Sequence, residues 1–209
     1  MGGARYGRTV HLGAPRVEWV KSTRNVGNGT DMKIGKGLRN VTGLKVGIVA
    51  AKFNQSVTDK LLSSCLAGLA KHGVKDGHIE VVRVPGAFEM PLVAKTLAKS
   101  GRFDAVVCLG AVIRGDTPHF DYICAEVSRG IGQAALETGV PIVFGVLTTE
   151  TVAQAVERAD PAKFNRGGEA AQVALEMVTV MRMIKGDVGK LKSGKPSSQY
   201  GGIRQRGKR

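Results

Sequence analysis

Residues 105–122, with the sequence AVVCLGAVIRGDTPHFDY, join a continuous apolar run to a loop that contains glycine and proline. An apolar run without polar alternation predicts a strand buried on both faces, here over 105–109. The loop over 110–118 then leads into a predicted helix over 120–137. A buried strand followed by a helix is the unit from which parallel α/β sheets are built.

The same strand and helix order recurs on both sides of this stretch. Further predicted strands cover 45–51, 79–84 and 141–147, and further predicted helices cover 56–72, 89–100, 149–159 and 168–184. Ser56 and Asp59 have the spacing of a capping box, which predicts the start of the first helix. With right-handed crossovers, we expect a four-stranded parallel sheet in a three-layer α/β/α sandwich of flavodoxin-like type.

The charge of the 209-residue chain, formally +14, is concentrated at its two ends. Residues 41–184 hold 15 Lys/Arg and 14 Asp/Glu, whereas residues 1–40 carry +6 and residues 185–209 carry +7. We therefore expect one nearly neutral domain over 41–184 between two basic, disordered extensions. These extensions either remain solvated or make weak contacts with nucleic acid through counterion release.

Cysteine usage and hydropathy bear on the cellular compartment. Cys65, Cys108 and Cys124 lie in apolar runs without C-x-x-C spacing, which predicts free buried thiols and a reducing compartment. No segment is long and apolar enough to span a membrane, and the N-terminus lacks the apolar core of a secretory signal. We expect a cytoplasmic protein without membrane contact; an organelle transit leader or a translation start at Met32 stays open.

In a parallel sheet, ligands bind beyond the carboxyl ends of the strands. The loop after the third strand carries Arg114 and Thr117 close to a helix start, an arrangement suited to an anion. His119 in the same loop either transfers protons near neutral pH or serves as a polar cap residue. Phe53, after the first strand, either stacks on a planar ligand or covers the end of the sheet.

Three further charged residues are candidates, each with a plain alternative. Glu89 follows the second strand and is either a ligand or a first-turn acid favoured by the helix dipole. Arg158 and Arg166 are close enough in sequence to suggest a phosphate contact, although isolated arginines are more often solvated surface charges. The chain has neither Cys/His metal-ligand spacing nor a G-x-S-x-G nucleophile motif, so we expect no metal site.

Six short segments lie at or near the predicted strand ends and helix starts: GIVAAKFN at 47–54, VPGAFE at 84–89, GAVIRGDTPHFDY at 110–122, FGV at 144–146, ERA at 157–159 and NRGGE at 165–169. In their order and spacing, over about residues 43–184, they resemble the lumazine synthase family. Arg166 departs from the pattern, because the family usually has Lys there. The basic extensions have no counterpart in the family.

The resemblance implies a transferase of riboflavin biosynthesis that acts without cofactor or metal. It would condense 5-amino-6-(D-ribitylamino)uracil with 3,4-dihydroxy-2-butanone 4-phosphate to give 6,7-dimethyl-8-ribityllumazine, phosphate and water. The family forms homo-pentamers, in some members icosahedral 60-mer shells, with active sites at subunit interfaces. Two alternatives stay open: a catalytically idle shell or scaffold, and a flavin-binding protein, each with polyanion-binding basic tails.

The resemblance also implies site residues. His119 would be the proton donor, and Phe53 would stack on the pyrimidine ring. Phe144 and Arg158 would come from the neighbouring subunit and contact the pyrimidine and the phosphate. The other implied substrate-binding residues are Asn54, Ala87, Phe88, Glu89, Ala111, Val112, Ile113, Arg114, Asp116, Thr117 and Arg166.

Overall fold

Four parallel strands form the centre of residues 43–185, the part of the chain that this computed structural model describes. The strands are β1 (Val46–Ala51), β2 (Ile79–Val84), β3 (Ala105–Ile113) and β4 (Ile142–Thr149). Their order in the sheet is β2-β1-β3-β4, so β2 and β4 are the edge strands. The predicted four-stranded parallel sheet is confirmed.

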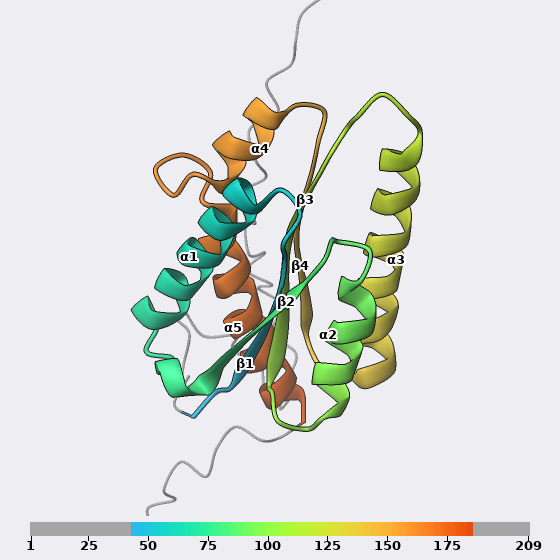
Figure 1. The fold of residues 1–209 in the computed structure, drawn as a ribbon. Helices are drawn as coiled ribbons and strands as arrows, with labels where there is room; N and C mark the ends of the chain where they lie inside the picture. The colour runs from blue at the N-terminus through green and yellow to red at the C-terminus, as the bar shows by residue number, and fades with distance from the viewer. Residues whose placement is uncertain (1–42, 186–209) are drawn as a thin grey trace, which may run out of the picture. The chain divides into compact units, whose positions relative to one another are not determined.

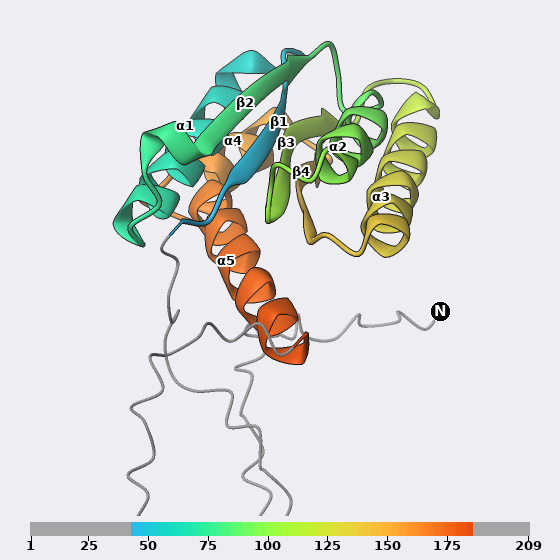
Figure 2. The ribbon, with the colours of Figure 1, turned by 90° about the horizontal axis from the view of Figure 1, so that it is seen from below.

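Helices cover both faces of this sheet (Figures 1 and 2). One layer contains α1 (Gln55–Lys71), α4 (Val152–Ala159) and α5 (Arg166–Ile184). The other contains α2 (Met90–Lys99) and α3 (His119–Thr138), and a short 3-10 helix, Asp76–His78, precedes β2. The predicted three-layer α/β/α sandwich of flavodoxin-like type is confirmed.

The hydrophobic core lies on both sides of the sheet, which explains why the central strands have continuous apolar runs. All six residues of β1 are buried. Ile48 and Ala50 pack in the core cluster beneath α1 and α5, whereas Val49 and Ala51 pack in the cluster beneath α2. Because successive strand residues point to opposite faces, every residue of such a strand must be apolar.

The boundary predicted for the end of β3 is wrong. The sequence pattern predicts a loop over residues 110–113, but β3 continues through Ile113, which is in register with Thr149 of β4. Gly110 has a packing role here, because a Cβ at this position would lie 2.7 Å from the Cε atom of Met90. Gly110 therefore makes room for a side chain of α2 and does not mark the end of the strand.

The starts of two helices also differ from prediction. The capping box of Ser56 and Asp59 does not form: α1 begins one residue earlier, after Asn54 in a left-handed conformation with φ 55°. The Asp59 carboxylate instead accepts a hydrogen bond from Arg83 Nη2 at 2.6 Å. Helix α4 begins only at Val152, because β4 extends to Thr149.

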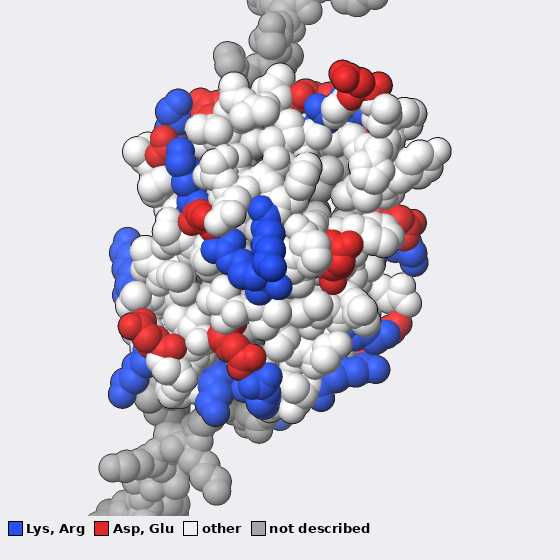
Figure 3. All heavy atoms as spheres, viewed as in Figure 1, with Lys and Arg blue, Asp and Glu red and all other residues white. Residues whose placement is uncertain are grey.

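The charged side chains of the described domain are mixed. Figure 3 shows Lys and Arg interspersed with Asp and Glu on one face, as expected for its nearly balanced charge. Within residues 43–185, no helix combines the length and apolarity needed to cross a membrane. The predicted basic extensions lie outside the described residues, apart from Lys185 at the end of α5. The predicted division at residues 40 and 184 stays a prediction.

Candidate active site

The loops that follow β1 and β2 meet the end of β3 at the carboxyl edge of the sheet. Phe53 N–H donates to the carbonyl oxygen of Pro85 at 2.9 Å, which joins the first two loops. Asn54 Nδ2 donates to the carbonyl oxygen of Ala111 at 2.9 Å, which joins the β1 loop to β3. Between β1 and β3 the sheet changes the direction in which strands are added, and ligands bind at such switch points.

Two aromatic rings stay exposed at this edge. Phe53 is 69% exposed and Phe88 is 56% exposed. The alternative that Phe53 merely covers the end of the sheet does not fit this exposure within the subunit. Flat rings held by neighbouring loops are suited to stacking on a planar heterocycle.

Glu89 closes the turn in front of α2. Its Oε2 atom accepts a hydrogen bond from Gly86 N–H at 2.8 Å, while its Oε1 atom has no partner among the described residues. Ala87, between them, is buried. The carboxylate therefore shapes the loop, and the ligand contact predicted for Glu89 stays a prediction.

The residues predicted as a binding loop after β3 are largely strand residues. Ala111 is 4% exposed and packs in the core beneath α1, and its carbonyl oxygen accepts the Asn54 side chain. Val112 and Ile113 are half-buried against the two core clusters. The substrate contacts predicted for Ala111, Val112, Ile113 and Asn54 stay predictions, but the structure gives all four a part in building the edge.

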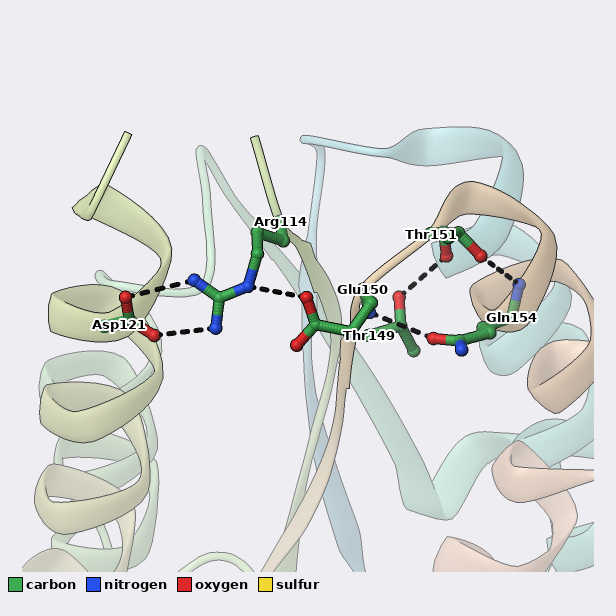
Figure 4. A network of polar contacts seen from close by, with 6 residues as sticks. All are labelled: Arg114, Asp121, Thr149, Glu150, Thr151 and Gln154. Atoms are coloured by element: carbon green, nitrogen blue, oxygen red, sulfur yellow. Dashed lines mark hydrogen bonds and ion pairs between the residues drawn. The ribbon is translucent and has the colours of Figure 1, made fainter. Parts of the chain in front are cut away.

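Arg114 lies where the chain leaves β3, and carboxylates surround its guanidinium. Nη1 and Nη2 donate to Asp121 at 3.0 and 2.8 Å, and Nε donates to Glu150 at 2.6 Å (Figure 4). Its Cζ atom lies 4.2 Å from the centre of the Phe120 ring. The direct substrate contact predicted for Arg114 stays a prediction, and this geometry favours a structural role. Its two partners, Asp121 and Glu150, were not among the predicted site residues.

His119 is the first residue of α3, and its side chain is exposed. The turn before it contains Asp116 and Thr117, which are also exposed. No side chain caps α3, so His119 is not the polar cap residue considered as the alternative. An imidazole at the open end of a helix can exchange protons with a bound ligand.

A second group of predicted residues lies along the outer edge of β4. A groove of about 570 Å³ is bounded by β4, α5 and the ends of α3 and α4. It is lined by Phe144, which is 41% exposed, and by Arg158 and Arg166. None of the predicted residues of the carboxyl edge lines this groove. On one subunit, the predicted site residues thus form two separate groups.

Phe164, which was not among the predicted site residues, links the two arginines of this groove. Its ring centre lies 5.6 Å from Arg158 Cζ and 5.9 Å from Arg166 Cζ. Arg166 also forms an ion pair with Glu169, and Arg158 Nη1 donates to the carbonyl oxygen of Gln154 at 3.2 Å. An exposed aromatic residue between two arginines in sequence was the available signal, because guanidinium groups stack on aromatic rings.

Metal and thiol chemistry have no visible basis in the described residues. In this part of the chain, no group of three or more His, Cys, Asp or Glu residues is placed to hold a metal ion. Burial raises the pKa of the Cys65 and Cys108 thiols to about 12, so neither is a ready nucleophile.

Comparison with known protein families agrees with the fold and with the arrangement of these segments. Residues 43–182 match the family described as 6,7-dimethyl-8-ribityllumazine synthase. The match begins where β1 is about to start and ends within the last turns of α5, so it covers every strand of the sheet. The chain therefore belongs to the 6,7-dimethyl-8-ribityllumazine synthase family, which acts in riboflavin biosynthesis.

Proposed function

We propose that this chain condenses 5-amino-6-(D-ribitylamino)uracil with 3,4-dihydroxy-2-butanone 4-phosphate to give 6,7-dimethyl-8-ribityllumazine, phosphate and water. The observation that carries the proposal is the division of the predicted residues into two groups. The carboxyl edge of the sheet presents exposed aromatic rings and His119, while the groove beside β4 presents Phe144 and two arginines. Two such surfaces on different subunits would complement one another in a homo-oligomer.

The carboxyl edge would bind the pyrimidine substrate. Phe53 would stack on its ring, and the free oxygen of Glu89 together with the backbone near Phe88 would hold its polar groups. The exposed turn of Asp116 and Thr117 would contact the phosphate-bearing substrate. Much of the rate would then come from holding two reactive molecules together.

The groove of a neighbouring subunit would close the site. Phe144 would cover the pyrimidine, and Arg158 with Arg166 would neutralise the phosphate as it leaves. His119 would donate the proton that assists the elimination and ring closure. We infer a homo-pentamer, the assembly that the family resemblance implies, in which each subunit would give one surface and receive the other.

The first test is the absorbance of lumazine formed from the two substrates by the full-length, assembled protein. His119→Ala is expected to lower kcat by about 10²–10⁴-fold, the usual contribution of a positioned proton donor. An assembled wild type that makes no product would refute the proposed reaction. That outcome would leave a shell, scaffold or flavin-binding protein as the explanation.

A second test asks whether each site is shared between two subunits. Co-expression of His119→Ala with Arg158→Ala subunits is expected to restore part of the activity that each variant lacks alone. Some interfaces of the mixed assembly would pair an intact carboxyl edge with an intact groove. Mixed assemblies no more active than the two single variants would contradict the shared site.

A further inference from the structure

We propose that Arg114 is a positioning residue: by holding Asp121 and Glu150 it fixes the first turn of α3, and with it His119, at the active site. We call Arg114, Asp121 and Glu150 the Arg114 clamp. The inference rests on the proposed function, because it assigns the clamp a task only if His119 takes part in the reaction.

The first turns of α3 have few other contacts to fix them. The buried residues of α3 are Val127, Ile131 and Ala134. His119 precedes the first of these by eight residues, which is about 12 Å of helix. In Figure 1 this end of α3 extends past α2, its neighbour in the layer. Phe120 and Ile123 are only half-buried. Polar contacts therefore have to contribute much of the interaction that keeps the first turns of α3 in place.

The clamp has a geometry that only arginine provides. Asp121, two residues after His119, accepts two hydrogen bonds from the same guanidinium, at 2.8 and 3.0 Å. A paired contact of this kind fixes direction as well as distance. The Phe120 ring, 4.2 Å from the Arg114 Cζ atom, holds the plane of the guanidinium. Lysine would keep the charge but lose the paired and stacked contacts.

Glu150, the other partner, is itself tied to the frame of the domain. Its backbone N–H donates to Gln154 Oε1 at 3.0 Å, and Gln154 N–H donates to Thr151 Oγ1 at 3.2 Å (Figure 4). Arg114 N–H donates to the carbonyl oxygen of Thr149 at 2.9 Å. The clamp therefore joins the start of α3 to the ends of β3 and β4 and to the start of α4.

The charge balance argues against Arg114 as a direct phosphate ligand. One guanidinium stands between two carboxylates, so the clamp carries a net negative charge. The hydrogen bonds that Arg114 donates to Asp121 lower the pKa of that carboxyl, and those that it donates to Asp121 and Glu150 raise the pKa of Arg114. Arg114 and Asp121 thus stay ionised around neutral pH, and the excess of carboxylates would repel an approaching phosphate.

Arg102 offers a matched control at the other end of β3. Its Nη1 and Nη2 atoms donate to Glu80 at 2.6 and 3.3 Å, and its Cζ atom lies 4.8 Å from the centre of the Phe103 ring. This is the same combination of a paired carboxylate and a stacked ring. It lies before β3 begins, away from the carboxyl edge, so Arg102→Ala should leave the rate unchanged.

The experiment measures kcat and KM for both substrates on the full-length, assembled protein. Arg114→Ala is expected to lower kcat about tenfold to hundredfold, as small displacements of catalytic groups do. Both KM values should change less than about twofold, because no ligand contact is removed. Arg114→Lys and Asp121→Asn should give smaller losses of the same kind. In a His119→Ala background, Arg114→Ala should cause no further loss, since the clamp acts through that residue.

Several outcomes would overturn the inference. A large rise in KM for the phosphate substrate would make Arg114 a direct ligand, and an undiminished loss in the His119→Ala background would show that it does not act through His119. A wild-type rate in Arg114→Ala, or an equal loss in Arg102→Ala, would also exclude positioning. If Arg114→Ala does not assemble, Arg114→Lys and Asp121→Asn decide. An inactive wild type refutes the proposed function as well, whereas an active wild type with unaffected variants refutes only the clamp.

Discussion

Among the glycines of residues 43–185, Gly167, the second residue of α5, has the least room for a side chain. A Cβ atom there would lie 2.2 Å from the carbonyl oxygen of Leu61 and 2.9 Å from its carbonyl carbon. Leu61 is fully buried in the middle of α1, and the obstructing atoms belong to its backbone. Gly167→Ala therefore cannot be accommodated by a change of rotamer.

The cost of this substitution can be worked out from the geometry. Ordinary contacts of a Cβ atom begin near 3.4 Å, so α1 and α5 must separate locally by more than about 1 Å. Overpacking of this kind costs about 1–3 kcal/mol, and the better helix propensity of alanine returns at most about 1 kcal/mol. Subtracting that return leaves a net loss of up to about 2 kcal/mol, which corresponds to a fall in Tm of up to roughly 8 °C for a chain of this size.

Thermal unfolding of the assembled protein measures this loss. All variants must be compared at one protein concentration, because assembly makes Tm depend on concentration. Gly132→Ala in α3, where a Cβ meets no heavy atom within 4 Å, is the control and should leave Tm unchanged or raise it. Gly68→Ala should lie between the two, because its closest contact, at 2.9 Å, is the side chain of Ala171. A Gly167→Ala protein at least as stable as Gly132→Ala would refute the argument.

Two further predictions concern ionisable groups. Ellman's reagent at pH 8 should modify at most Cys124 in the native protein and all three cysteines after unfolding, because burial raises the pKa of Cys65 and Cys108 to about 12; rapid native modification of all three would contradict this. Lys95, 2.5 Å from Glu137, lowers the pKa of that carboxyl. The stability contributed by this pair is therefore present above the unfolded pKa of Glu137, about 4.5, and is lost as the pH falls through the lower folded value. Wild type and Glu137→Gln should differ in Tm at pH 7 and converge in acid, and a difference that persists undiminished at low pH would contradict the assignment.

The fold was predictable because the central strands of this sheet can be recognised in the sequence as continuous apolar runs. A strand such as β1, buried on both faces, must be apolar at every position, and its sequence shows this directly. The end of β3 was not predictable, because Gly110 is required by the Met90 side chain of another element. A rule based on neighbouring residues interprets glycine as the end of a strand, and it does not include the contact between Gly110 and Met90.

The sequence was sufficient to predict which segments form the candidate site, but not which side chains contact one another within it. Topology places the loops after β1, β2 and β3 at one edge, so the sequence order of the strands was sufficient to bring Phe53, Glu89 and His119 to that edge. The partners of Arg114 were not predictable, since one lies seven residues away on α3 and the other lies 36 residues away after β4. Packing between distant segments also places Arg166 in the groove with Phe144. The sequence alone did not predict that these two residues lie together.

Strand β4 is the element that the two groups of site residues share. Glu150 of the Arg114 clamp directly follows its carboxyl end, while its outer edge carries Phe144. Its backbone has little freedom between these points, because a Cβ at Gly145 would lie 2.7 Å from the carbonyl oxygen of Cys108 on β3. If sites are shared between subunits, β4 belongs to its own subunit's site at one end and to a neighbour's at its edge. The rigid contact of β4 with β3 would then fix the position of one half-site relative to the next around the assembly.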